Sequence, residues 1–308
     1  MKVSIIVSVY NGADILPVTI PALLQQDYPQ HLTEIICVDD ASTDNTETLL
    51  SSPNWQDKIK VIRHNRNKGR CATRNTGINA ATGDLLIFLD CELEIQKNFI
   101  SKHVAWHEKE NVIGVVSNLK PKDSDNLDKY QRYIFYGKRG ARLVKPGISL
   151  PFKYFILGCS SVKVSAIETT GLFNEALPGY GVDLEYAYRL WKNHQKGLFF
   201  APDIEVYMHK LKTLERAMED FREYGGKNVP VILNKFPELA PYVGADFVSL
   251  RWRKDYFKRI LGVLFINSFS IKIAKLKQKI LPYPISNLFT RYLLLASVVS
   301  GYRASLKK

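Results

Sequence analysis

Short apolar runs alternate with helix-forming segments throughout the first 90 residues. Four runs predict strands, because each is short, rich in Val, Ile and Leu, and bounded by polar residues; they lie at 3–9, 35–38, 60–63 and 85–89. Three helices are predicted between them, at about 14–26, 44–50 and 71–81. Strands and helices that alternate in this way build an α/β fold, with a doubly wound, mostly parallel sheet and helices on both of its faces.

Beyond residue 94 the alternation is less regular. The further predicted elements are helices at 98–108 and 183–192, strands at 112–117, 155–164 and 199–207, and a charged, tyrosine-rich loop or helix at 124–142. Some helix ends are predicted from their capping signals. Asp14 is expected to cap the first helix, and Asp44 with Glu47 has the spacing of a capping box. Gly225-Gly226 is expected to end a helix that begins at Leu214.

Polar and charged residues follow the predicted strands where each strand ends. In doubly wound sheets, ligands bind in the crevice beyond the carboxyl ends of the strands. The residues at those ends are Tyr10-Asn11, Asp39-Asp40, the basic loop 63–70, and Asp90-Cys91-Glu92. Carboxylates and bases are thus expected to gather at one edge of the sheet, and we predict that this edge is the active site.

Net charge is distributed unevenly along the chain. Of the formal charge of +13, residues 251–308 carry +12, from 13 Lys or Arg against one acid, Asp255. Residues 1–250 are nearly neutral, with 30 bases and 29 acids. A basic segment of this kind suits an anionic membrane surface or a nucleic acid. No recognised nucleic-acid-binding module accompanies the charge, so nucleic acid is not expected as a partner.

Five segments, in order, resemble glycosyltransferase family 2, whose catalytic domain has the GT-A fold. They are VSIIVSVYNG, ICVDDASTDNT, NKGRCATRNTGINAATGDLLIFLDCELE, ILGCSSVKVSAIETTGLFNEALPGYGVDLEYAYRL and APDIEVYMHK, which together cover roughly residues 3–210. The resemblance implies an inverting glycosyltransferase of the hexosyltransferase type. Its donor would be a nucleotide-diphosphate sugar, with UDP expected, and its cofactor a divalent metal, Mn²⁺ or Mg²⁺.

The resemblance also implies roles for the donor-side residues. Asp40 matches the aspartate that accepts a hydrogen bond from the nucleobase, with Tyr10 against the ring and Arg70 beside the base or the phosphates. Asp90 and Glu92 fall at the family's D-x-D signature, where Asp90 would contact ribose and metal and Glu92 would bind the metal directly. Glutamate replaces the second aspartate here, yet it still supplies the oxygen that a hard cation prefers. For Asp39, a binding role and plain turn chemistry both remain open.

Acceptor-side roles follow from the segment GVDLE at 181–185. Asp183 matches the general base, and Glu185 is expected to support the acceptor site or the local fold. Val182 stands where the family usually has an additional acid, which is a departure from the pattern. His209 follows a late strand where some relatives supply a histidine to the metal, so it is either a metal ligand or a structural residue.

The predicted domains are a GT-A domain at 1–250 and a basic, amphipathic helical tail at 251–308. Within the first, 1–95 is the nucleotide-binding half and 96–250 the acceptor-binding half. Lysines and arginines interleaved with apolar residues are typical of helices that lie in a membrane interface. We therefore expect a cytoplasmic enzyme, peripheral on the inner face of the cell membrane, acting on a lipid-linked or surface-glycan acceptor. A solvated helical appendage or an oligomer contact is the alternative for the tail.

Residue patterns bear on the location as well. The seven-residue apolar run that ends at Val9 is predicted to be a strand, not a signal peptide. Four widely separated cysteines predict free thiols in a reducing compartment. Two other functions remain open: a nucleotidyltransferase that makes a nucleotide sugar, and a non-catalytic relative that acts as a scaffold. The first usually has a glycine-rich basic loop after the first strand, which the sequence YNGADIL does not provide.

Overall fold

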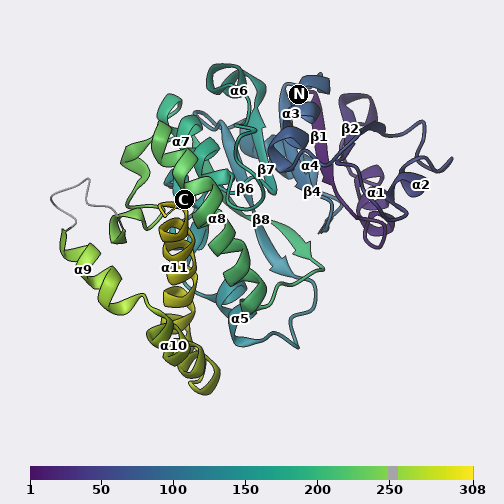
Figure 1. The fold of residues 1–308 in the computed structure, drawn as a ribbon. Coiled ribbons are helices and arrows are strands. Elements are labelled where there is room, and N and C mark those ends of the chain that lie inside the picture. Colours follow the sequence, from purple (N-terminus) through teal and green to yellow (C-terminus); the bar gives the residue numbers. More distant parts are fainter. Residues whose placement is uncertain (249–255, 308) are drawn as a thin grey trace. The chain divides into compact units, whose positions relative to one another are not determined.

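The computed structural model describes residues 1–248 and 256–307 of the chain (Figure 1). Two compact units can be distinguished. Unit 1 comprises Met1–Lys122, Arg139–Glu175 and Asp183–Lys210, and unit 2 comprises Asp123–Lys138, Ala176–Val182 and Leu211–Lys308. The boundary predicted at residue 250 falls within 249–255, outside the described residues, so the division into 1–250 and 251–308 stays a prediction.

Unit 1 is built on one eight-stranded sheet in the order β3-β2-β1-β4-β7-β6-β8-β5. Its strands are β1 (Val3–Val9), β2 (Thr33–Asp39), β3 (Lys60–Arg63), β4 (Leu85–Asp90), β5 (Leu93–Ile95), β6 (Gly114–Pro121), β7 (Cys159–Lys163) and β8 (Leu198–Met208). The first four strands pair in parallel, as β6 and β8 do, whereas β7 and β5 run antiparallel to their neighbours. The predicted α/β class with a mostly parallel sheet is confirmed.

Helices connect and cover these strands. In unit 1 they are α1 (Leu16–Leu24), α2 (Thr46–Leu50), α3 (Arg70–Ala80), α4 (Phe99–His107), α6 (Val164–Thr170) and α7 (Asp183–Asn193), with 3₁₀ turns at Gln30–Leu32, Gly140–Leu143 and Phe152–Tyr154. The segment predicted as a loop or helix at 124–142 contains α5 (Lys129–Tyr136), which belongs to unit 2.

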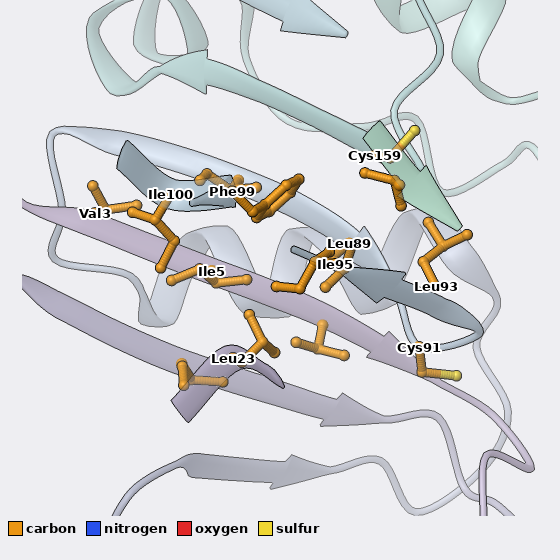
Figure 2. Close-up of a cluster of buried hydrophobic side chains, with 14 of the residues drawn as sticks. Val3, Ile5, Leu23, Leu89, Cys91, Leu93, Ile95, Phe99, Ile100 and Cys159 are labelled. Atoms are coloured by element: carbon orange, nitrogen blue, oxygen red, sulfur yellow. The ribbon is translucent and has the colours of Figure 1, made fainter. Parts of the chain in front are cut away.

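The core of unit 1 explains why its first strands read as unbroken apolar runs. Ile5 and Val7 of β1 are fully buried, and so is Ile6 between them, whose side chain points to the opposite face. Figure 2 shows Ile5 in one buried cluster with Leu89 of β4 and Phe99 of α4. Each such side chain contributes about 1.5–3 kcal/mol when removed from water. This sheet with two buried faces is the rigid support from which the strand ends project.

Two of the predicted helix caps are wrong. Helix α1 begins after Ile15 without any side-chain cap, and Asp14 instead forms an ion pair with Lys210. The backbone carbonyl of Gly12 accepts the hydrogen bonds of the first turn in its place. Asp44 accepts a hydrogen bond from the backbone N–H of Thr46, but α2 has no capping box. In both cases the aspartate carboxylate bonds to another nearby group and does not cap the helix.

Unit 2 is helical. Besides α5 it contains α8 (Leu214–Lys235), α9 (Tyr256–Phe265), α10 (Ser268–Ile280) and α11 (Ser286–Ser305), with 3₁₀ turns at Pro237–Leu239 and Ala245–Phe247. Within the described part of the chain, no helix is both long enough and apolar enough to cross a membrane.

Helix α8 does not end at Gly225-Gly226, so that prediction is wrong. The helix continues through both glycines to Lys235. A Cβ atom at Gly225 would lie 2.1 Å from the carbonyl oxygen of Val298 in α11, and one at Gly301 would lie 1.9 Å from the carbonyl oxygen of Arg222. These glycines let two helix backbones approach closely, and the packing outweighs the roughly 0.5–1 kcal/mol that glycine costs in a helix.

The seven residues Ala176–Val182 form a short segment of unit 2 between two long stretches of unit 1. Helix α8 holds this segment at two points. The side-chain amide of Asn228 donates a hydrogen bond to the carbonyl oxygen of Tyr180 at 2.9 Å. A Cβ atom at Gly181 would lie 2.5 Å from the ring of Tyr224, and the φ of +80° also favours glycine there. The chain re-enters unit 1 at Asp183.

Candidate active site

The carboxyl ends of the central parallel strands bring the predicted acidic residues to one edge of the sheet. In the register of the sheet, Val9 of β1 lies beside Asp39 of β2, and Ser8 lies beside Asp90 of β4. Tyr10 follows β1 directly and is half exposed. The topology therefore places residues 10, 39–40 and 90 around the end of one strand.

Asp39 and Asp40 both point into the protein and hold loops in place. Asp39 is paired with Arg63 and accepts a hydrogen bond from the backbone N–H of Ser42 at 3.0 Å. This supports the turn-forming role for Asp39. The carboxylate of Asp40 accepts the backbone N–H groups of Lys68 and Gly69, each at 2.8 Å.

Asp40 also contacts a histidine and so fixes the start of α3. One of its oxygens lies 2.7 Å from Nδ1 of His64, and its side chain is buried. Gly69, the residue before the helix, has a φ of +85° that favours glycine. Asp40 thereby positions Arg70, the first residue of α3. A hydrogen bond from the nucleobase to Asp40 stays a prediction.

Two arginines on one face of α3 reach Asp90. Arg70 and Arg74 are four residues apart, the spacing that places side chains together on a helix. Nη2 of Arg70 lies 3.9 Å from Oδ2 of Asp90, and Nη2 of Arg74 lies 3.5 Å from Oδ1. Arg74 has no role among the predictions from the sequence, although its i+4 relation to Arg70 is a usable signal.

Arg74 joins the two parts of the candidate site. Its Nη1 donates a hydrogen bond to Oδ1 of Asp183 at 2.8 Å, while Nη2 faces Asp90. The side chain is only 1% exposed, and within the described residues its Nε and Nη2 make no hydrogen bond. A guanidinium buried this deeply requires compensating charge, and the two carboxylates supply it. Asp90 and Asp183 therefore lie beside the same cation.

The turn after β4 directs Asp90 and Glu92 away from the core. Cys91 between them is packed in the buried cluster of Figure 2, and burial raises the pKa of its thiol to about 12. Asp90 and Glu92 on either side of it are only partly buried. Gly158 makes room for Asp90, because a Cβ atom there would lie 2.7 Å from Oδ2 of Asp90.

Asp183 and Glu185 occupy the first turn of α7 but differ in surroundings. The side chain of Asp183 is a quarter exposed and contacts Arg74. Glu185 is buried and binds Arg189 through both carboxylate oxygens, at 2.9 and 3.1 Å. Arg189 also donates to the backbone carbonyl groups of Thr170 and Leu172. This geometry favours a role for Glu185 in the local fold.

His209 lies against a carboxylate that the sequence analysis did not consider. Its Nε2 is 2.7 Å from Oε2 of Glu94, and Nζ of Lys122 is 2.8 Å from the other oxygen. Burial alone would raise the pKa of Glu94, but the hydrogen bonds from Lys122 and His209 outweigh it and lower the pKa below its usual value. His209 therefore has a partner of its own beside the acidic motif.

The residues present fit a hard divalent cation in part. Asp90 and Glu92 offer carboxylate oxygens, the donors that Mg²⁺ and Mn²⁺ prefer. Among residues 1–248 and 256–307, no group of three or more His, Cys, Asp or Glu side chains is arranged to hold a metal ion. A metal at this motif would thus need oxygen ligands from a bound diphosphate, which is the usual arrangement for Mg²⁺ with phosphate substrates.

A cavity of about 350 Å³ lies elsewhere in unit 1. It is lined mainly by apolar side chains, among them Leu86, Val164 and Ile167. It also includes Gly83, which precedes β4, so it lies toward the amino end of that strand and not at its carboxyl end. The cavity brings together no set of catalytic groups.

A family model matches more than half of the chain. The family model described as "Glycosyl transferase family 2" matches residues 4–169. The chain belongs to glycosyltransferase family 2. The matched residues include the carboxyl ends of the four parallel strands and both arginines of α3.

Relatives of this family member share parts of its sequence. The uncharacterised glycosyltransferase YfnE of Bacillus subtilis is 26% identical over an alignment of 251 residues, and the match covers 65% of this chain and 62% of that protein. Undecaprenyl-phosphate 4-deoxy-4-formamido-L-arabinose transferase of Yersinia pestis is 38% identical over 134 residues, 41% of this chain and 39% of that protein. The chain thus spans less than two thirds of the length of these relatives.

Solved structures share the fold. Staphylococcus aureus TarS 1-349 has a TM-score of 0.59 at 17% identity, covering 100% of this chain and 92% of that one. The mannosyltransferase PcManGT of Pyrobaculum calidifontis has a TM-score of 0.64 at 16% identity, covering 99% and 87%. The predicted GT-A fold is confirmed by these likenesses.

Proposed function

We propose that this family 2 protein transfers a hexosyl group from a nucleotide-diphosphate sugar to an acceptor hydroxyl, with inversion at the anomeric carbon. The observation that carries the proposal is the bridge made by Arg74. One buried guanidinium holds Asp90, at the donor motif, and Asp183, the candidate base, at the same edge of the sheet. A single displacement needs these two groups near the same anomeric carbon.

Donor binding is assigned to the ends of β1 and β2 and to the start of α3. The half-exposed ring of Tyr10 would lie against the nucleobase, and Asp40 would accept a hydrogen bond from it. The cation of Arg70 would lie beside the base or the phosphates. UDP is proposed as the nucleotide, because S. aureus TarS has been crystallised with UDP and with UDP-GlcNAc, although PcManGT was solved with GDP-Man.

A divalent metal, Mn²⁺ or Mg²⁺, is proposed as the cofactor, held by Asp90 and Glu92. When bound, it would offset the negative charge of the leaving diphosphate. PcManGT and GalNAc-T7 were both solved with Mn²⁺, which supports this choice. His209 stays a further candidate ligand, and its imidazole would first have to leave Glu94.

Asp183 is proposed as the general base. Its carboxylate takes the proton of the acceptor hydroxyl as the acceptor oxygen attacks the anomeric carbon and the bond to the diphosphate breaks. Arg74 keeps the Asp183 side chain in a fixed orientation through the 2.8 Å hydrogen bond. Glu185 acts indirectly, because its pair with Arg189 keeps the first turn of α7 in place.

The acceptor and the location are proposed from the relatives and from the charge of the chain. Relatives include a poly(ribitol-phosphate) glucosyltransferase, a chondroitin synthase and the undecaprenyl-phosphate transferase. These names support a lipid-linked or polysaccharide acceptor. We place the enzyme in the cytoplasm, peripheral on the inner face of the cell membrane and attached to its anionic surface.

Calorimetric titration with UDP tests the donor site. The parent protein should bind UDP more tightly with Mn²⁺ or Mg²⁺ than with a chelator, and Glu92→Ala should remove the difference. Glu108→Ala is the matched control, since this exposed glutamate lies at the end of α4. Equal UDP affinity of the parent with metal and with chelator would exclude the metal hypothesis.

Product analysis separates the rival functions. A transferase supplied with metal and its correct nucleotide sugar releases the nucleoside diphosphate, by transfer or by slow hydrolysis. A nucleotidyltransferase instead releases pyrophosphate from a nucleoside triphosphate and a sugar phosphate. A scaffold does neither, even when a panel of nucleotide sugars is supplied.

A further inference from the structure

Helix α10 of unit 2 has two apolar faces. One face is packed within unit 2 and includes Ala274, which is 4% exposed. The other carries Phe269, Ile273, Leu276 and Ile280, which are 72%, 38%, 58% and 67% exposed. Their spacing of four, three and four residues places these four side chains within about 60° of one another around the helix axis. We call them the α10 stripe.

Lysines flank the α10 stripe on both sides. Successive helix positions differ by about 100°, so Lys272 and Lys279 fall along one flank and Lys277 along the other, while Lys275 lies farther round, about 130° from the middle of the stripe. The ammonium group of Lys277 lies 5.6 Å from the ring centroid of Phe289 in α11. An exposed apolar band bordered by ammonium groups is the pattern of a helix that lies in a membrane interface.

Exposed apolar side chains continue beyond both ends of α10. Leu264 and Phe265 at the end of α9 are 60% and 58% exposed, and Leu288 in the first turn of α11 is 67% exposed. The sequence from 256 to 307 contains no aspartate or glutamate. No acidic side chain in this range therefore opposes the lysines or repels a negatively charged surface.

We propose that the α10 stripe inserts into the interface of an anionic membrane, with Lys272, Lys275, Lys277 and Lys279 at the level of the lipid phosphates. The helix lies parallel to the membrane surface and does not cross it. Apolar burial and attraction to anionic lipids then act together on one element. The surface belongs to unit 2; the inference rests on the membrane attachment proposed above and is independent of the chemistry proposed for the sheet edge.

Charge argues for a membrane and against a second copy of the chain. If two α10 stripes packed on each other, the lysines that flank one stripe would lie close to those that flank the other, and like charges repel. Anionic lipid headgroups supply the opposite charge across the whole length of the helix. The same charge would also suit an acidic protein, but a protein built only for that partner would not partition onto vesicles.

Vesicle sedimentation of the full-length protein tests the proposal. The parent should partition onto vesicles of phosphatidylcholine mixed with phosphatidylglycerol, and only weakly onto phosphatidylcholine alone. Phe269→Ser with Leu276→Ser should lower the partition coefficient by at least about tenfold, because two apolar side chains no longer insert. Lys272→Gln with Lys275→Gln and Lys279→Gln should lower it on the order of a hundredfold at low salt.

Matched controls come from unit 1. Ile148, 58% exposed, and Leu143, 50% exposed, are replaced by serine as the apolar control. Exposed Lys58, Lys97 and Lys145 are replaced by glutamine as the charge control. Neither control should change partitioning by more than about twofold, because surface substitutions outside the contact are close to neutral.

An independent readout covers variants that lose stability. Phe269→Trp keeps an aromatic ring in the stripe, and its fluorescence should shift to the blue when phosphatidylglycerol vesicles are added. Equal partitioning of the parent and the Phe269→Ser with Leu276→Ser variant, or no partitioning of the parent at all, would overturn the proposal. A dimer that dissociates with the same substitutions, or an acidic protein bound in place of vesicles, would overturn it as well.

Discussion

The sheet edge of unit 1 and the α10 region of unit 2 use charge in opposite ways. At the sheet edge, the buried cation of Arg74 lies against the partly exposed carboxylates of Asp90 and Asp183. In α10, exposed ammonium groups of one sign surround an apolar stripe. Exposed charges are screened by salt over about 8 Å at physiological ionic strength, whereas buried pairs are screened much less. The arrangement around Arg74 fixes the positions of side chains, whereas the exposed lysines of α10 attract an anionic surface from a distance.

Removal of the candidate base is the sharpest test of the geometric role. Asp183→Asn keeps the size of the side chain but cannot take a proton, so sugar transfer should fall by roughly 10² or more. UDP and metal affinity should remain within a few-fold, since Asn can still accept a hydrogen bond from Arg74. Transfer rates and calorimetric UDP affinities are measured side by side.

The controls for Asp183 separate chemistry from structure. Exposed Asp57→Asn should leave both measurements unchanged. Glu185→Gln should lower the melting temperature, because it weakens a buried pair with Arg189, and should reduce transfer less than Asp183→Asn does. A dead Glu185→Gln enzyme with normal stability, beside an active Asp183→Asn enzyme, would move the base by two residues.

Acid should destabilise unit 1 and spare unit 2. His103 and His107 in α4 are hydrogen-bonded to Ser161, and burial lowers the pKa of each to about 3. The unfolded chain takes up these protons near pH 6.5. The two neutral histidines therefore stabilise the fold fully above about pH 6.5. Below that pH, each of them should lower the free energy of unfolding by about 1.4 kcal/mol per pH unit.

Hydrogen exchange at about pH 7 and about pH 5.5 measures this effect, on peptides from α4 and from α8. After correction for the intrinsic pH dependence of exchange, protection should fall in α4 and hold in α8. None of the six histidines lies in 123–138, 176–182 or 211–308, so unit 2 has none of its own. Exposed His31→Gln is the control and should leave the difference intact. Equal loss in both helices would mean that the two units unfold as one.

Adding a methyl group should affect stability differently at two adjacent glycines of unit 2. Gly225→Ala places a Cβ atom 2.1 Å from a carbonyl oxygen of α11 and should destabilise the protein by about 2 kcal/mol. Gly226→Ala is the matched control, because the nearest atom would lie at 3.4 Å, an ordinary contact. Urea denaturation followed by far-UV circular dichroism compares them. Equal losses would show that helix propensity, not the contact with α11, decides at these positions.

Arg74→Lys should have the smallest effect among these changes. Lysine keeps the positive charge but lacks the planar, two-sided donor set that reaches both Asp90 and Asp183. Transfer should fall by about tenfold, mainly in kcat, because the base loses orientation more than the donor loses affinity. The Arg74→Met enzyme should have a lower transfer rate and a lower free energy of unfolding than the Arg74→Lys enzyme. Equal activity of the two variants would show that charge at this position is unimportant.

Patterns among neighbouring residues predicted the strands and the sheet edge, because these features depend on short stretches of sequence. The apolar runs of β1 and β4 identified strands, and the position of Asp90 at a strand end identified the edge where it lies. Arg74 could not be assigned in this way, because its hydrogen bond to Asp183 joins residues 109 positions apart. The helix end predicted at Gly225 is wrong for the same reason. Its contact with Val298 joins two helices far apart in the sequence, and the residues next to Gly225 do not indicate this packing.

The segment Ala176–Val182 gives the candidate base a mechanical dependence on α8. Asp183 is the first residue of unit 1 after this segment, and its carboxylate is held by Arg74 while the chain just before it is held by Asn228 and packed against Tyr224. The candidate base therefore follows directly on a segment that α8 holds, and its own side chain is held by Arg74. A library screened for lost turnover with normal UDP binding should therefore return substitutions in the middle of α8. Substitutions that restore turnover should map to 176–182, because a more flexible segment there would let the Asp183 carboxylate return to its position.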